Sequence, residues 1–345
     1  MIKKLYNTNT LEKSELIQVI KDNMDSLDPK LLHYAAKTRE KYYGKKVFFR
    51  GLIEVSNYCK NDCLYCGIRR DNDKVKRYRL SKEEILNSCK VGYKLGFRTF
   101  VLQGGEDGYY TDEIMVDIIS TIKNSYPDCA ITLSLGEKSY ETYKKYFEAG
   151  ADRYLLRHES ATVEHYNKLH PSNMEFEHRK DCLYNLKDVG FQVGAGFMVG
   201  SPYQSIENMA EDLLFLKELN PHMVGIGPFI PHKDTVFAKE KAGTVHMTLL
   251  MLALTRLLLP KSLLPATTAL GSIDPKGREK ALRIGANVIM PNLSPVDNRK
   301  NYALYDNKLS TDSEAAESVN SISKSIREFG FVPDFSRGDY IHWKR

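Results

Sequence analysis

The chain has 345 residues, of which 42% are hydrophobic, and its 50 basic and 44 acidic residues give a formal net charge of +6. This length and apolar content allow one large domain, or two small ones, with a sizeable core. The near balance of charges does not favour nucleic-acid binding, and neither a signal peptide nor an apolar segment long enough to cross a bilayer is recognisable, so we expect a cytoplasmic protein.

Short apolar runs typical of strands alternate with segments of helical periodicity along the chain. A helix start is predicted at Asp28 and Pro29, and capping boxes are predicted from Ser81 to Glu84 and from Thr311 to Glu314. Eight strand and helix units favour an α/β fold, a full (β/α)8 TIM barrel, with an open doubly wound sheet as the alternative. The predicted strands are 47–55, 99–103, 130–135, 153–156, 192–199, 223–229, 264–270 and 286–290.

We expect a single domain over residues 1–345. No linker rich in Gly, Ser or Pro divides it. A barrel takes about 250 residues, which leaves room at both ends. We therefore predict a helical extension at 1–45, the barrel at 46–300 and a C-terminal tail at 301–345.

The most informative motif is SNYCKNDCLYCGIRR, in which Cys59, Cys63 and Cys66 have CxxxCxxC spacing. Iron–sulfur clusters usually take four cysteines, so three thiolates can hold three irons of a 4Fe–4S cubane and leave the fourth iron for an exchangeable ligand. A zinc site normally has four ligands in paired spacing, and a disulfide framework is not expected in a long chain with six cysteines. The remaining cysteines are expected to be buried and inert: Cys89, Cys129 and Cys182.

In a parallel barrel, functional side chains gather at the carboxyl ends of the strands. Charges in such strands are costly to bury unless they face a ligand or each other, although a structural role is the alternative for Arg153. The histidines include no HExxH pair, and His158 is interpreted as a supporting or core residue rather than a metal ligand. The candidates at strand ends are Gln103, Gly104, Gly105, Glu106, Asp107, Ser134, Arg153, Arg157, Glu159, Thr267 and Thr268.

The cysteine spacing, with Tyr65 inside it, resembles that of the radical S-adenosylmethionine (SAM) superfamily. Eight blocks in chain order resemble, more specifically, the HydE family of FeFe-hydrogenase maturases. The resemblance implies a complete radical SAM barrel in which the open iron of one 4Fe–4S cluster binds SAM. The blocks are IEVSNYCKNDCLYCGIRRDN, RYRLS, LQGGED, TLSLGE, ADRYLLRHES, MVGIGPFIPH, PATTALGS and GANVIMPN.

The resemblance also assigns residues to two sites. The cluster ligands are Cys59, Cys63 and Cys66, and the residues expected near SAM are Tyr65, Gly104, Gly105, Glu106, Asp107, Ser134, Glu159, Arg179, Met198 and Met223. The residues expected in an internal anion-binding cavity are Arg50, Gln103, Thr132, Arg153, Arg157, Thr267, Thr268, Tyr302 and Tyr305.

For the substrate, the resemblance implies a cysteine-ligated Fe(CO)2CN complex supplied by the maturase HydG, whose sulfur is attacked by the adenosyl radical before the product passes to HydF. Paired guanidinium and hydroxyl donors suit such an anionic ligand. Many relatives carry further cysteines for a second cluster, but residues 301–326 contain none, so one cluster is expected. Enzymes like methylornithine synthase or biotin synthase are the nearer alternatives, and a non-enzymatic metal-binding or RNA-binding scaffold is the more distant one.

Overall fold

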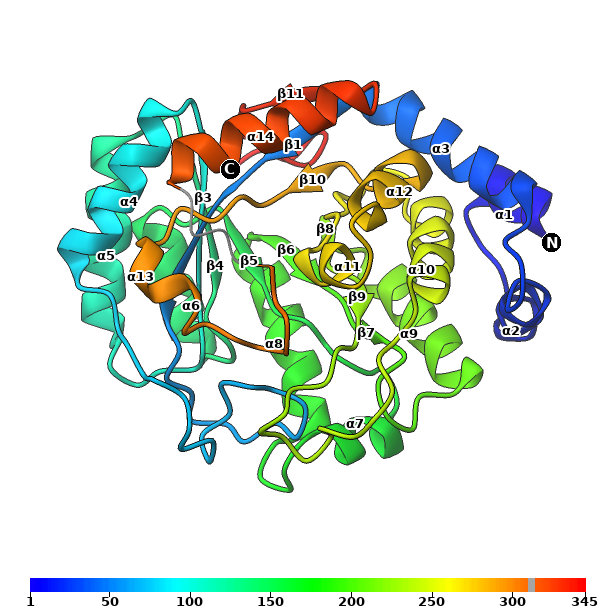
Figure 1. The fold of residues 1–345 in the computed structure, drawn as a ribbon, viewed down its shortest axis with the longest axis horizontal. Helices are drawn as coiled ribbons and strands as arrows, with labels where there is room; N and C mark the ends of the chain where they lie inside the picture. The colour runs from blue at the N-terminus through cyan, green and yellow to red at the C-terminus, as the bar shows by residue number, and fades with distance from the viewer. Residues whose placement is uncertain (310–313) are drawn as a thin grey trace.

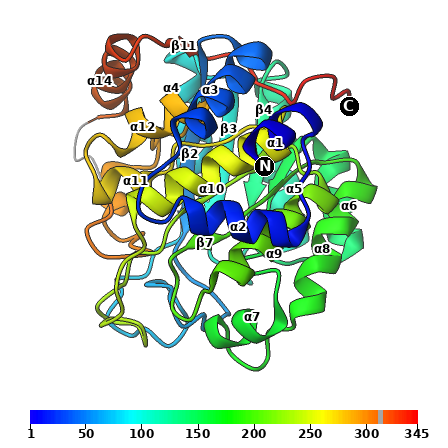
Figure 2. The ribbon, with the colours of Figure 1, turned by 90° about the vertical axis from the view of Figure 1, so that its right-hand side faces the viewer.

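The computed structural model describes residues 1–309 and 314–345. Three helices open the chain, α1 (Ile2–Thr8), α2 (Lys13–Asp22) and α3 (Pro29–Tyr43). The predicted helix start is confirmed, because the Asp28 side chain caps α3 and Pro29 is its first residue. The extension packs against the outer helices, with α2 on α9 (Ile206–Leu219) and both α1 and α3 on α10 (Val245–Leu258) (Figure 2).

A six-stranded parallel sheet forms the centre of the molecule. Its strand order is β2-β3-β4-β5-β6-β8, and each neighbouring pair is parallel. Its strands are buried for most of their length, as expected of parallel strands covered by helices. They are β2 (Gly51–Ser56), β3 (Thr99–Gly104), β4 (Ala130–Ser134), β5 (Arg153–Leu155), β6 (Gln192–Ala195) and β8 (Met223–Val224).

Helices lie along the outside of these strands, and Figure 1 shows the strands in the interior. The helix following the cysteine loop starts at the predicted capping box, in which Ser81 accepts from the backbone N–H of Glu84 and the Glu84 carboxylate accepts from that of Ser81. Thr311, in the second predicted box, lies outside the described residues. The remaining helices are α4 (Lys82–Lys94), α5 (Asp112–Ser125), α6 (Tyr140–Ala149), α7 (Val163–Leu169), α8 (Phe176–Val189), α11 (Thr268–Ile273), α12 (Gly277–Ile284), α13 (Val296–Arg299) and α14 (Ala315–Glu328).

The other strands are short. They form a three-stranded sheet of order β10-β1-β11 and a two-stranded pair, β7-β9. Three predicted strands are therefore each interrupted: 47–55 divides at Arg50, 192–199 divides after Ala195, and 223–229 divides after Val224. The strands are β1 (Lys46–Phe49), β7 (Met198–Val199), β9 (Gly227–Pro228), β10 (Val288–Ile289) and β11 (Val332–Asp334).

The strand predicted at 264–270 is wrong. Leu263 and Pro265 make only isolated parallel bridges, to Met223 and Val288. Thr267 is instead the N-cap of α11, where its hydroxyl accepts from the backbone N–H of Leu270. A threonine that can cap a helix competes with continuation of the strand.

No helix in the described part of the chain is long and apolar enough to cross a membrane. The longest apolar helix, α10, is buried along almost its whole length between its neighbours. Most of its Leu and Met residues belong to the main hydrophobic core.

Candidate active site

A cavity of about 360 Å³ lies at the carboxyl ends of the strands, and all three motif cysteines line it. They occupy the loop after β2. The loop approaches the end of β3 so closely that a Cβ atom on Gly105 would lie 2.1 Å from the Tyr58 carbonyl oxygen and 2.8 Å from Cys59 Cβ. Gly105 is thus required by the close approach of two backbones.

Burial raises the pKa of all three motif thiols, to about 12 for Cys66 and well above the ordinary value for Cys63, with Cys59 raised as well. Metal binding requires thiolates, so bound iron would have to stabilise their charge. Among residues 1–309 and 314–345, no three His, Cys, Asp or Glu side chains converge closely enough to hold a single metal ion. A cubane needs a wider arrangement because each thiolate binds a different iron, so this donor set fits the expected cluster.

Arg77 holds the two ends of the cysteine loop together. Its guanidinium donates to the carbonyl oxygens of Asn57, before the motif, and of Ile68 (2.9 Å), after it. Further bonds reach the carbonyls of Arg69 (2.6 Å) and Asn72 (3.0 Å). The basic run at 74–79 therefore contains one residue that shapes the cysteine loop.

Tyr65, inside the motif, lines the cavity, and its hydroxyl lies 3.3 Å from Nε2 of His170. The Nδ1 atom of His170 lies 2.9 Å from the Tyr166 carbonyl oxygen and must donate to it, which leaves Nε2 as the acceptor for Tyr65. Burial lowers the pKa of His170 to about 3, so this imidazole is neutral at neutral pH. The backbone N–H of Leu64 also donates to the Leu169 carbonyl (3.0 Å), so the end of α7 fixes the middle of the motif.

Most residues expected near SAM do line the cavity: Tyr65, Gly104, Gly105, Glu106, Ser134, Glu159, Arg179 and Met198. Asp107 does not, because its carboxylate is held outside by Arg79 (2.7 and 2.9 Å) and by the Ser56 hydroxyl (2.7 Å). Met223 does not either, since it packs in an apolar cluster with Leu263 and Val288.

Two ion pairs contribute charged side chains to the cavity wall. Arg179 Nε lies 2.8 Å from Glu137 Oε1, and Arg157 Nη2 lies 3.1 Å from Glu159 Oε2. Burial opposes the charge on Arg179, but Glu137, Tyr166, Glu106 and Tyr65 together outweigh burial and raise the pKa of Arg179, which stays cationic. Glu159 has a left-handed backbone (φ 64°), a costly conformation for a residue other than glycine, and such strain is often found at functional sites.

Six of the nine residues expected to bind an anion also line the cavity: Gln103, Arg157, Thr267, Thr268, Tyr302 and Tyr305. Arg50, Thr132 and Arg153 do not. Arg153 is the first residue of β5, at the opposite end of the strand from the cysteine loop, and Arg50 lies where β1 and β2 divide. The expectation that all nine residues share one cavity is therefore corrected for these three.

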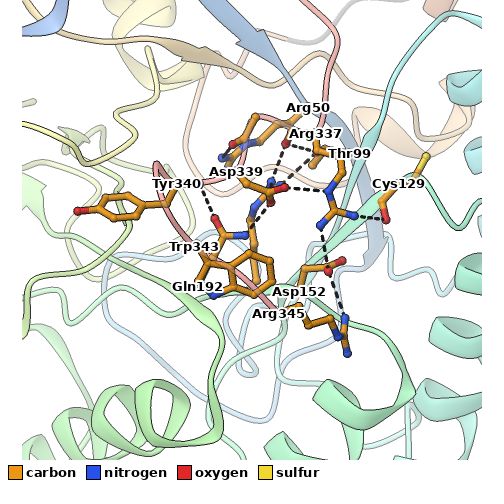
Figure 3. Close-up of polar contacts among 12 residues, drawn as sticks. Arg50, Thr99, Cys129, Asp152, Gln192, Arg337, Asp339, Tyr340, Trp343 and Arg345 are labelled. Atoms are coloured by element: carbon orange, nitrogen blue, oxygen red, sulfur yellow. Dashed lines mark hydrogen bonds and ion pairs between the residues drawn. The ribbon is translucent and has the colours of Figure 1, made fainter. Parts of the chain in front are cut away.

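Arg153 belongs instead to a polar network at the amino ends of the strands, which we call the basal network. Figure 3 shows other members of it, including Asp152, Arg337 and Asp339. Its guanidinium pairs with Asp339 of the C-terminal tail (2.5 Å) and donates to the Arg337 carbonyl (2.6 Å). The tail is held further by Asp152, which pairs with both Arg337 and Arg345 at 3.1 Å. The structural alternative for Arg153 is thus the arrangement observed.

Sequence reasoning missed Glu54 and Lys308, which pair directly and line the same cavity. Glu54 is fully buried in β2. A carboxylate inside an apolar strand is costly unless it is paired, which was the available signal. Lys308 gave no such signal, because its position depends on the path of the chain after β10.

The sequence profile of the Radical SAM superfamily matches residues 53–216. The chain is 50% identical over 303 residues to the FeFe-hydrogenase maturase subunit HydE of Thermotoga maritima, covering 88% of this chain and 86% of that one. It is 32% identical over 306 residues to the 3-methylornithine synthase of Methanosarcina acetivorans, covering 88% and 85%. A crystal structure of methylornithine synthase (PylB) superposes with a TM-score of 0.84 at 27% identity, covering 96% and 97%. Together with the cysteine loop and its cavity, these similarities show that the chain is a radical SAM enzyme and belongs to the HydE family of FeFe-hydrogenase maturases.

Proposed function

We propose that this enzyme acts in the maturation of the FeFe-hydrogenase active site, on a sulfur-containing, cysteine-ligated Fe(CO)2CN substrate. The observation that carries the proposal is that one cavity is lined by two chemically different groups of residues. One group is the cysteine trio, and the other is Arg157 with Thr267 and Thr268. The cavity can thus hold a cofactor and an anionic substrate together.

On the cofactor side, the three cysteines would bind one 4Fe–4S cluster, and Glu159, Arg179, Ser134 and the backbone at Gly104 would orient SAM. When bound and reduced, the cluster supplies the electron that cleaves SAM to a 5′-deoxyadenosyl radical. Arg179 and Glu159 line the cavity, and each is already ion-paired. Such side chains are held in place before the ligand arrives, which limits the entropy lost on binding.

On the substrate side, Arg157 would provide a planar fork for a carboxylate or cyanide ligand, and the two threonines would provide hydroxyl donors. The Gln103 amide donates to the Tyr302 hydroxyl (3.3 Å), which fixes both groups at the cavity wall. These donors suit an anion bearing a carboxylate. We propose that HydG delivers this substrate and HydF receives the product, through transient contacts.

We also propose that the strands close into a complete barrel of eight strand positions. Three isolated parallel bridges support this closure, because they lie where the six-stranded sheet and β10 would join. They connect Met223 to Leu263, Pro265 to Val288 and Leu52 to Asn292. Such a ring would enclose the cavity on all sides.

A second candidate is an activity like that of methylornithine synthase, which the similarity to that enzyme in sequence and in structure favours. The deciding experiment incubates the reconstituted enzyme with SAM and a reductant in two separate assays. One assay contains lysine, and the other contains the iron complex, the other maturases and apo-hydrogenase. We expect hydrogenase activation and no consumption of lysine. Lysine consumption without activation would favour the second candidate.

The same assay tests the substrate side. Arg157→Leu removes the charge but retains much of the bulk, so we expect cluster content to be retained and hydrogenase activation to fall at least about tenfold, because a charge-assisted contact is lost. Arg283→Leu, on the exposed side of α12, is the matched control. Normal activation by Arg157→Leu would remove Arg157 from the substrate site.

A further inference from the structure

Residues 301–309, here called the strap, form part of the wall of the cavity, to which they contribute Tyr302, Leu304, Tyr305 and Lys308. The outer side of the strap faces a second pocket of about 260 Å³, which is lined by basic residues including Lys233 and Lys300. Tyr302, Tyr305 and Lys308 line both spaces. The strap is thus the wall between an outer basic pocket and the inner cavity.

Hydrogen bonds fix the strap to separate loops. The Asn57 side chain donates to the Asn301 carbonyl (2.7 Å), and the backbone N–H of Gly67, directly after the last motif cysteine, donates to the Leu304 carbonyl (2.8 Å). At the far end, the backbone N–H of Leu309 donates to the Ser272 hydroxyl (3.1 Å). These hydrogen bonds fix the position of the strap relative to the cysteine loop and to α11.

A single buried charge pair attaches the strap to the interior of the sheet. The Lys308 ammonium binds the carboxylate of Glu54, whose side chain is fully buried, while 12% of the lysine side chain is exposed. Asn292 donates to the other carboxylate oxygen of Glu54 (2.8 Å), and Lys308 also donates to the Tyr302 carbonyl (2.7 Å). A buried carboxylate is costly without its cation, so displacing the strap would leave Glu54 uncompensated.

The ammonium of Lys308 has three N–H donors, and the bonds to Glu54 and Tyr302 use two of them. Its side chain faces the cavity that Arg157 and the two threonines also line. A cation at this position can hold the strap closed and still offer a donor to an anion inside. Holding the strap and binding an anion both depend on the positive charge of Lys308. Only holding the strap also depends on the negative charge of Glu54.

We propose that Lys308 contacts the anionic substrate, and that its ion pair with Glu54 is the latch that closes the strap over it. The inference rests on the proposed function for the nature of the substrate. Substrate would reach the cavity from the outer basic pocket when the latch opens. Closure of the strap then excludes water and places the lysine charge against the bound anion.

The test uses the cluster-reconstituted, SAM-bound enzyme and L-cysteine as the probe, a thiol that carries a carboxylate. Lys308→Gln removes the cation and leaves Glu54 unpaired, whereas the double variant Glu54→Gln/Lys308→Gln removes both charges and leaves two amides that can bond to each other. Lys324→Gln, at an exposed lysine of α14 that pairs with Glu328 on the surface and lines neither pocket, is the matched control. Cluster content verifies that each variant folds.

We expect both variants to bind L-cysteine at least about tenfold more weakly than the wild type in equilibrium dialysis, because both lack the charge. Hydrogen exchange in the strap of the substrate-free enzyme should become faster in Lys308→Gln and return toward the wild-type rate in the double variant. Recovery of probe affinity in the double variant would show that Lys308 only supports the structure, and unchanged exchange in Lys308→Gln would refute the latch. Neither measurement uses hydrogenase activation, so a failure of the proposed function would be seen separately.

Discussion

Individual buried charges determine how this site is built. Arg179 and Glu54 are buried and Arg77 is partly buried, and each faces specific partners: Glu137 for Arg179, Lys308 for Glu54 and backbone carbonyls for Arg77. Buried charges of this kind are strongly destabilising when one partner is removed. Substitutions at these positions should therefore affect the site more than their distance from the reacting atoms suggests.

Arg179 is the clearest case on the cofactor side. We expect Arg179→Ala to weaken SAM binding by about 1.5–3 kcal/mol, because it removes a charge-assisted donor and leaves Glu137 unpaired. Isothermal titration of the reconstituted enzyme with SAM measures this change. Asp181→Ala, on the exposed side of α8, should bind SAM normally. Unchanged affinity in Arg179→Ala would give Arg179 a purely structural role.

Arg77 should control cluster assembly rather than SAM affinity. Arg77→Lys keeps the charge, but an ammonium cannot reach carbonyl groups on both sides of the motif as the planar guanidinium does. We expect lower iron and sulfide content after reconstitution and faster extraction of iron by a chelator. The exposed neighbour provides the control, Lys76→Met. Equal iron content and equal extraction rates in both variants would show that Arg77 is not needed to form the loop.

At the scale of elements, the carboxyl ends of the strands carry the cavity and the amino ends carry the C-terminal tail. The tail pairs as β11 with β1 and then runs to the basal network. Gln192 at the start of β6 also binds the tail: its amide donates to the Asp339 carboxylate and accepts from the backbone N–H of Tyr340, at 2.7 Å in each case (Figure 3). The tail thus seals the end of the sheet that lies opposite the cysteines.

The basal network should open in acid. Burial opposes the charge of Asp339, but Arg153 and Arg337 outweigh it and lower its pKa to about 2 from 3.8. A carboxyl group with a lowered pKa stabilises the folded state above pH 3.8, and this contribution is lost as the pH falls toward 2. We expect the protection factors of the amides in residues 335–345, which compare each exchange rate with the intrinsic rate at the same pH, to fall over that interval. Asp339→Asn should show fast exchange at neutral pH and lose this dependence; a wild-type tail that stays protected at pH 2 would contradict the assignment.

The sequence predicted element types better than element ends. Short apolar runs between helical segments identified most central strands, because parallel strands buried on both faces are continuous apolar runs. It could not show that Arg50 interrupts the first run, or that Thr267 caps a helix, because both depend on long-range contacts. Arg153 was placed at the wrong end of its strand for the same reason: its partner, Asp339, lies 186 residues away in the chain. The contacts of Lys308 with Glu54 and Tyr302 could not be predicted from the sequence either.

For the whole molecule, the arrangement separates three tasks in space. The cysteine loop would hold the cofactor, the strap covers the cavity that the loop shares with Arg157, and the tail closes the amino ends of the strands. The N-terminal helices pack on the outer helices, away from the cavity lining. Changes to the cofactor site, the strap and the tail should therefore be separable by experiment, since distant sites act nearly independently.

The number of clusters is the property of the whole chain that most directly tests this organisation. Only Cys59, Cys63 and Cys66 line the cavity, and the other three cysteines are buried. We therefore expect anaerobic reconstitution to give about four irons and four sulfides per chain, because one cubane contains that number. Its electron paramagnetic resonance spectrum after reduction should change on addition of SAM, and replacing any one of these three cysteines by Ala should abolish the cluster. Cys89→Ala, deep in the core, should retain it. Iron for two clusters, or a stable zinc site that excludes iron, would overturn the assignment, because the three thiolates would then not be the only ligands or would bind a different metal.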